Sequence, residues 1–200
     1  MRSVLALAVA LTAITSSRAA AQGAWGLGVE VGIVRFWGAS GPLAGSDELS
    51  LRPYRPTHVG LRLDREIGAL RLALNARYAQ SALGGEFEGG ATIFTDGFTL
   101  LELAPEAAVP LARFGPGAAL RGFAGPVLYF WMHSDEATRT RVGARGGLEL
   151  EAPLGGRVSV VTRLHGGIAG SALDQADVPP GYEVRSMPSA GVALGLRVGL

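Results

Sequence analysis

The sequence predicts an all-β fold, a single eight-stranded antiparallel β-barrel with up-and-down topology. Three observations carry this prediction. Apolar residues alternate with small or charged residues in seven segments, and an eighth segment, 118–131, is strand-like although its two faces are not cleanly distinguished. The connections between these eight segments alternate in length, and glycine is abundant. The chain holds 30 glycines among 200 residues, of which 48% are hydrophobic and 18% charged. Because glycine inside a helix costs about 1 kcal/mol relative to alanine, long helices are not expected.

The N-terminal segment has the features of a secretory signal peptide. Arg2 gives a positive start, an apolar run follows at 4–14, and small residues at 19–21 provide a cleavage site. We therefore expect a signal peptide at 1–21 and one barrel domain at 22–200. The chain contains no cysteine, so the exported domain is expected to be stable without disulfides.

The first and last candidate strands show the alternation most clearly. In segment 25–33, a tryptophan and four aliphatic residues alternate with three glycines and Glu30. In segment 191–200, five aliphatic residues alternate with small residues and Arg197. A period of two is typical of a strand with two unlike faces. The eight predicted strands, in order, are 25–33, 58–64, 70–79, 101–109, 118–131, 141–152, 158–168 and 191–200.

The connections between these strands alternate in length. Short connections fall near 64–68, 110–117 and 153–156. Long ones, rich in glycine, proline, serine and aspartate, fall at about 38–56, 80–97, 132–139 and 169–184. Both chain ends then lie on the side of the short turns, which is the layout of an outer-membrane barrel with long extracellular loops.

The residues opposite the apolar face favour a transmembrane barrel over a soluble one. That face is mostly glycine, alanine, arginine and glutamate, and small residues suit the cramped interior of eight strands better than a water-facing exterior. Aromatic residues near the predicted strand ends and turns fit the girdles expected at the two membrane interfaces. They are Trp25, Phe36, Trp37, Tyr78, Phe98, Phe114, Phe130 and Trp131.

These features resemble the small eight-stranded outer-membrane barrels, such as the OmpA transmembrane domain and OmpX. The resemblance covers about residues 23–200 and rests on architecture. The strand at 191–200 looks like the C-terminal signal that such barrels present to the barrel-assembly machinery. That signal usually ends in an aromatic residue, and Leu200 departs from this pattern.

Charged residues on the small-residue face are expected to fill the barrel interior as a paired network, because unpaired charges in a narrow lumen are costly. The expected network consists of Glu30, Arg62, Arg71, Arg77, Glu102, Glu106, Arg145, Glu149, Arg163 and Arg197.

The four long connections hold ten acidic and three basic residues, a net charge of −7. Such a charge excess is usually a solvated surface; the alternative is a surface that binds divalent cations or a basic partner. Arg35, Arg141 and Arg185 are expected near the outer rim, where they could contact lipopolysaccharide phosphates.

Catalysis and metal binding have little support in the sequence. The histidines fall in separate elements without metal-ligand spacing, so no metal and no cofactor are expected. His58, His133 and Ser134 are the candidates if the protein is an enzyme, but no hydrolase motif surrounds them. A formal net charge of +1 without a basic block argues against nucleic-acid binding.

The sequence thus predicts a monomeric barrel in the outer membrane of a Gram-negative-type bacterium, in contact with membrane lipid and lipopolysaccharide. Its expected role is structural or surface-interacting, through four acidic extracellular loops. A lipid A or phospholipid hydrolase is the alternative, and a narrow, porin-like pore is the third possibility.

Overall fold

The computed structural model describes residues 25–42, 50–87, 90–115, 117–132, 138–178 and 180–200. The predicted signal peptide and the candidates His133 and Ser134 lie outside the described residues. Among the residues described, no helix combines the length and apolar character needed to cross a bilayer. Eight long strands form the barrel: β1 (Trp25–Phe36), β3 (Ser50–Ile67), β4 (Leu70–Phe87), β5 (Gly90–Phe114), β6 (Ala118–Met132), β7 (Arg139–Gly155), β8 (Val158–Ala169) and β10 (Met187–Gly199).

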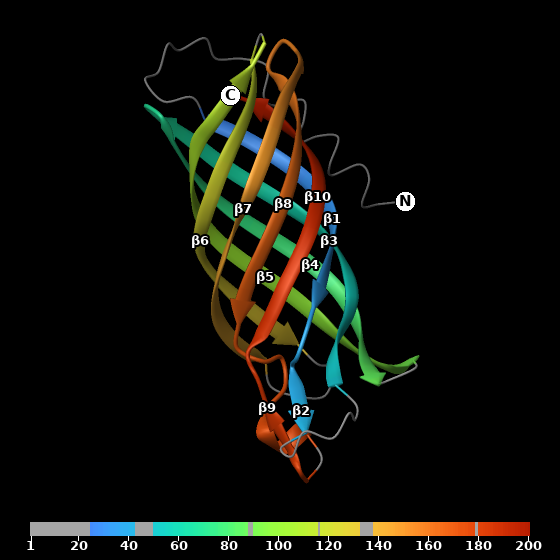
Figure 1. The fold of residues 1–200 in the computed structure, drawn as a ribbon. Coiled ribbons are helices and arrows are strands. Elements are labelled where there is room, and N and C mark those ends of the chain that lie inside the picture. The colour runs from blue at the N-terminus through green and yellow to red at the C-terminus, as the bar shows by residue number, and fades with distance from the viewer. Residues whose placement is uncertain (1–24, 43–49, 88–89, 116, 133–137, 179) are drawn as a thin grey trace.

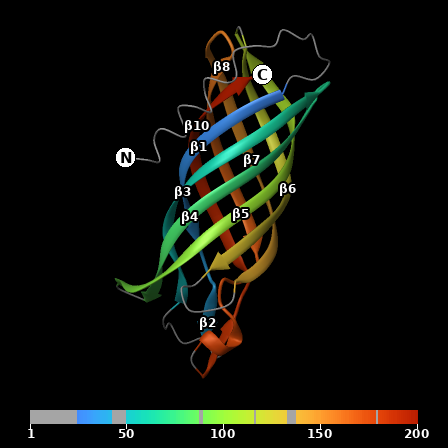
Figure 2. The same cartoon turned by 180° about the vertical axis from the view of Figure 1, so that it is seen from behind.

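The strands close into a barrel in the order β1-β10-β8-β7-β6-β5-β4-β3, and every neighbouring pair is antiparallel (Figures 1 and 2). β1 and β10 complete the closure through a continuous register from Gly26↔Gly199 to Phe36↔Ser189. The predicted eight-stranded antiparallel barrel is therefore confirmed.

The apolar face of each strand forms the outer wall. On β10, Leu194 is 55% exposed while its neighbour Ala193 is 2% exposed. On β1, Val31 and Ile33 are 51% and 56% exposed. A row of exposed aliphatic residues around a closed barrel is the reverse of a water-soluble barrel, whose apolar side chains face inward.

Glycine on the inner wall lets the chain pass close to its neighbours. A Cβ at Gly195 would contact the carbonyl oxygen of Val29 and lie 3.0 Å from the Cβ of Glu30. A larger side chain there would displace the wall or a charged neighbour. Gly68 has a different role, since its φ of 62° allows the tight turn between β3 and β4.

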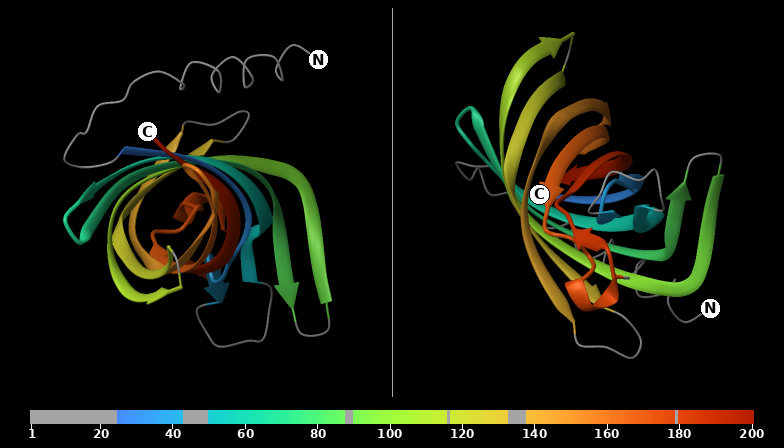
Figure 3. Two further views of the ribbon diagram at one scale, coloured as in Figure 1. Left: turned by 90° about the horizontal axis from the view of Figure 1, so that it is seen from above. Right: turned by 60° about the horizontal axis from the view of Figure 1, so that its bottom comes forward.

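Three strands are much longer than the sequence predicts. β3 and β4 have 18 residues each and β5 has 25, so much of the expected loops at 38–56 and 80–97 is strand. Their outer parts project beyond the barrel wall (Figure 3). The alternation is lost there because a strand beyond the barrel needs no apolar face toward lipid.

A small cap covers the same end of the barrel. Its elements are β2 (Ser40–Pro42), β9 (Tyr182–Val184) and the short 3-10 helix η1 (Gln175–Asp177). β2 and β9 pair as a two-stranded antiparallel sheet separate from the barrel sheet. All three elements lie within segments that were expected to be long loops.

The aromatic prediction is partly wrong. Trp25 and Trp37 are on the outer wall, but Phe36, Phe98 and Trp131 are 1%, 6% and 1% exposed and lie inside the barrel mouth. They form an apolar cluster with side chains from the strands and the cap. Its other large members are Leu100, Val127, Tyr129, Leu173, Val178 and Met187. The lumen is thus closed at its cap end by an apolar core.

Candidate functional site

The main candidate site is the charged interior below the apolar mouth. The structure places all ten predicted network residues on the inner wall, with side chains at most 11% exposed. Successive side chains of a strand point to opposite faces, so these residues all point into the lumen. They form three layers from the short-turn end toward the mouth.

The layer nearest the short turns is centred on Asp64 of β3. The Nη2 of Arg197 donates to Asp64 Oδ1 over 2.7 Å, and Arg71 Nε lies 3.6 Å from the same oxygen. Arg71 Nη2 also contacts Glu151 over 2.8 Å. Arg121 Nη1 donates to Glu151 over 2.6 Å, so this layer cross-links side chains from five strands.

The middle layer has two carboxylates at its centre. Glu149 is fully buried and contacts Arg62, Arg71 Nη1 at 2.9 Å and Arg163 Nε at 3.3 Å. Glu106 accepts from Arg163 Nη2 at 2.5 Å. Glu106 also accepts from Asn75 Nδ2 at 2.8 Å and Arg145 Nε at 2.6 Å. Each carboxylate therefore joins side chains from three other strands.

The layer nearest the mouth links Glu30 and Glu102 to arginines of other strands. Arg77 Nε donates to Glu30 over 2.5 Å, and Arg77 Nη1 lies 3.5 Å from Glu102. Arg145 contacts Glu102 as well. His58 is buried beside this layer, with its Nε2 3.8 Å from Glu30.

Positive and negative side chains are equal in number across the three layers. Seven arginines and seven carboxylates take part in the ion pairs of the described interior. Four of them, Asp64, Glu66, Arg121 and Glu151, are absent from the predicted network. Asp64 and Glu151 lie on the small-residue face of the predicted strands, so the alternation could have identified them.

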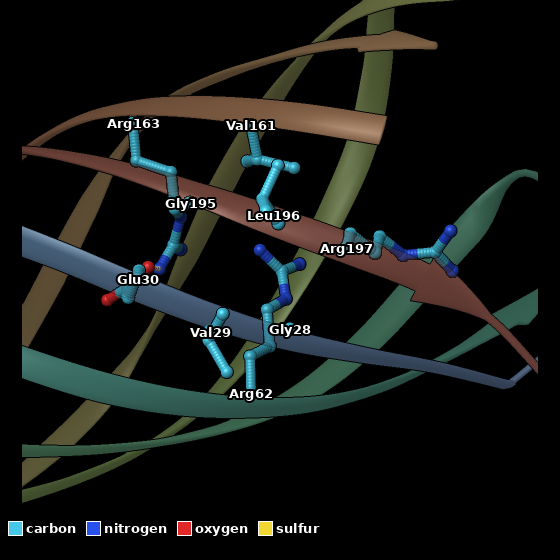
Figure 4. Close-up of a pocket in the computed structure, with 9 residues that line it drawn as sticks. All are labelled: Gly28, Val29, Glu30, Arg62, Val161, Arg163, Gly195, Leu196 and Arg197. Carbon is cyan, nitrogen blue, oxygen red and sulfur yellow. Dashed lines mark ion pairs between the residues drawn. The ribbon is translucent and has the colours of Figure 1, made fainter. Parts of the chain in front are cut away.

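The lumen has little free space at this level. A cavity of about 20 Å³ lies between β1, β3, β8 and β10, beside Glu30, Arg62 and Arg163 (Figure 4). That volume holds about one water molecule. Arg62 Nη2 has no hydrogen-bond partner in the protein, so the cavity beside Arg62 offers it a place for water.

The catalytic candidates do not assemble into a site among the described residues. His58 faces Glu30 and the ring of His165, whose centroid is 6.2 Å away. Ser171, in the cap segment, donates to the carbonyl of Ala39 over 2.8 Å. Within the described ranges, no group of three or more potential His, Cys, Asp or Glu ligands could hold a metal ion.

The three predicted rim arginines have different environments. Arg141 donates to the Ser171 carbonyl at 2.6 Å and to Asp174 at 2.5 Å, which holds the cap segment against β7. Arg185 pairs with Glu183 over 2.8 Å. Arg35 lies 5.3 Å above the ring of Trp37 on the outer wall.

The barrel shares its fold with a solved outer-membrane protein. The Neisserial surface protein A matches with a TM-score of 0.54 and 13% identity, over 88% of this chain and 97% of that chain. The fold is that of the small eight-stranded outer-membrane barrels. Ail of Yersinia pestis, solved with the heparin analogue sucrose octasulfate, matches this barrel with a TM-score of 0.45, 13% identity and coverage of 88% and 99%. No family model and no curated protein matches the sequence.

Proposed function

We propose that this protein is a bacterial outer-membrane barrel that acts by surface interaction and has no catalytic role. The exposed aliphatic wall supports a lipid-facing exterior. The short turns then face the periplasm, and the cap and the long β3–β4–β5 extension face outward. Export through a cleaved signal peptide and assembly through the C-terminal strand belong to the same proposal.

The observation that carries the surface role is an unpaired sheet edge. β5 pairs with β4 from Gly90 onward, whereas its pairing with β6 begins only at Thr99↔Met132. Among the described residues, no strand therefore pairs with the edge of segment 90–98 that faces away from β4. A polar depression of about 390 Å³, lined in part by Ser81 and Thr99, lies at the base of this edge. Exposed edges accept extended peptides through main-chain hydrogen bonds.

The test is peptide binding to the free edge. Successive N–H groups of a strand point to opposite edges, so one of the neighbouring changes Thr92→Pro and Ile93→Pro removes a donor from the free edge. Peptides selected from a random library on the nanodisc-embedded protein should bind that variant about tenfold more weakly, as expected for one lost hydrogen bond. Unchanged heat-modifiable gel mobility serves as the folding control. Binding that survives both substitutions, or a library that yields no binder, would contradict the proposed surface.

A pore is disfavoured by the filled lumen. Charged layers occupy the interior and an apolar cluster closes its mouth, so we expect no steady ion current when the barrel is inserted in a planar bilayer. Single-channel recording checks this. A stable ohmic conductance that scales with the number of inserted barrels would instead support the porin-like alternative.

The hydrolase alternative has no assembled site to support it among the described residues. His58 contacts Glu30, with no serine among the contacts described for it. Assays of lipid A and phospholipid turnover on the wild type, His58→Ala and His133→Ala would test this alternative directly.

Lipopolysaccharide contact is proposed mainly for Arg35. Arg35 shares the outer wall with the exposed Ile33 and Trp37, and its guanidinium lies 5.3 Å from the centre of the Trp37 ring. Arg35→Ala should weaken lipopolysaccharide binding about fivefold, the effect expected for one cation beside an anionic membrane surface. Lipopolysaccharide titration of the detergent-folded protein measures this. Equal losses in Arg35→Ala and Arg185→Ala would contradict the assignment.

A further inference from the structure

Each of the three short turns carries one exposed arginine. Arg65 precedes the β3–β4 turn, Arg113 is the last residue but one of β5 before the β5–β6 turn, and Arg157 lies in the β7–β8 turn. These turns all lie toward the end of the barrel that is uppermost in Figure 1. Because β3–β4, β5–β6 and β7–β8 are spread around the closed sheet, the three arginines form a discontinuous ring, here named the turn-side rim.

Exposed apolar side chains flank each arginine of the turn-side rim. The guanidinium of Arg65 lies 5.3 Å above the ring of Trp25, which is itself 43% exposed. Phe114, next to Arg113, is 52% exposed. Leu154, three residues before Arg157, is 64% exposed. A cation beside apolar surface suits the boundary where acyl chains end and headgroups begin.

The turn-side rim has an excess of positive charge. The acidic side chains described on the adjoining strand ends belong to the interior network. Asp64 is buried and bonded to Arg197, and Glu151 is bonded to Arg71 and Arg121. Glu66 is bonded to Arg71 and Arg121. The three rim arginines are therefore not neutralised by these carboxylates.

The position of the rim along the barrel matches one membrane interface. Trp25 and Trp37 bracket β1 at its two ends, and each has an arginine above its ring. Twelve residues of strand span about 40 Å, which becomes about 28 Å along the membrane normal at a tilt of about 45°. This is close to the hydrocarbon thickness of about 30 Å. Arg65 therefore lies at headgroup depth.

We infer that the turn-side rim binds the phosphate groups of anionic phospholipids in the leaflet that the short turns face. This inference rests on the proposed membrane location. Guanidinium groups bind phosphate through paired N–H donors, while the flanking apolar side chains contact the upper acyl chains. The rim thereby selects phosphatidylglycerol-type lipids over zwitterionic ones at the turn side.

Trp25 provides a local reporter for this inference. In a Trp37→Phe parent, Trp25 is the remaining tryptophan on the outer wall, since Trp131 is 1% exposed inside the mouth. The full chain would be folded into equimolar phosphatidylcholine and phosphatidylglycerol vesicles. Quenching of Trp25 by spin-labelled phosphatidylglycerol is then compared with quenching by equally labelled phosphatidylcholine. We expect about a fivefold preference for the anionic label, lost in high salt.

In the Arg65→Gln variant of the same parent, the ratio of quenching by labelled phosphatidylglycerol to quenching by labelled phosphatidylcholine should fall close to one. Arg185→Gln, the same charge change on an exposed arginine of the cap, should leave it unchanged. Equal quenching by both labels in the parent would overturn the inference while leaving the membrane location intact. No quenching by either label would instead contradict the proposed membrane location. If Arg65→Gln does not fold, the preference of the parent and its salt dependence still decide the question.

Discussion

Replacing Glu149 with glutamine is expected to lower the free energy of unfolding by about 3–5 kcal/mol, the usual cost of breaking a buried ion pair by removing one partner. Glu149 is fully buried and contacts Arg62, Arg71 and Arg163. Glutamine keeps the size of the side chain but leaves the three guanidinium groups with less negative charge. Urea unfolding of the protein in lipid vesicles, followed by tryptophan fluorescence, measures the loss.

The matched control is Glu183→Gln. Glu183 pairs with Arg185 over 2.8 Å, but both side chains are about half exposed, so its loss should cost at most about 1 kcal/mol. If the two variants lost the same stability, the interior network would not be the stabilising element described here.

An arginine at Leu194 is expected to destabilise the membrane-inserted barrel by about 2–4 kcal/mol, the cost of this cation at the bilayer midplane. Leu194 is 55% exposed at the centre of β10, opposite Val31 of β1 and Thr162 of β8. The same urea titration in vesicles measures the effect. The substitution tests the environment of the outer wall, because arginine at an exposed position in water would carry no such cost.

Leu154→Arg provides the control for depth. Leu154 is 64% exposed but lies at the β7–β8 turn, where arginine should cost about 0–1 kcal/mol. A Leu194→Arg variant as stable as Leu154→Arg, or more stable than the wild type, would contradict a lipid-facing wall.

The strand number, the closure and the facing of the wall were predictable from the sequence. In β10, aliphatic residues alternate with glycine, alanine and Arg197, and the structure separates these two sets onto opposite faces. The alternation is informative because lipid outside and a narrow lumen inside impose opposite demands on neighbouring residues.

The mouth of the barrel was not predictable by the same reasoning. Phe36 lies near a strand end, where a girdle residue is expected, but it falls on the glycine face of β1 and therefore points inward. Trp131 belongs to a strand whose two faces the sequence did not distinguish. Arg141 was expected to face lipid headgroups, yet Asp174, 33 residues further along the chain, binds it within the cap. Pairings across such distances depend on the fold of the cap, which local patterns do not encode.

The projecting parts of β3, β4 and β5 were also missed, for a different reason. Residues such as Gly84 and Gly85 read as turn formers, and segment 80–97 has no alternating pattern. The strands nevertheless stay paired, with a register shift between Ala82 and Leu83, through Gly84↔Ile93 to Phe87↔Gly90. Main-chain pairing extends the hairpin here, because pairing needs no regular side-chain pattern.

The central claim, a barrel whose apolar wall faces lipid, is tested most directly by folding into bilayers without detergent. The urea-unfolded protein is diluted either into phospholipid vesicles or into buffer alone, and unboiled and boiled samples are compared by gel electrophoresis after flotation. We predict a heat-modifiable form that floats with the vesicles, and aggregation in buffer. A folded, monomeric protein that stays soluble in buffer and does not float with the vesicles would contradict the claim.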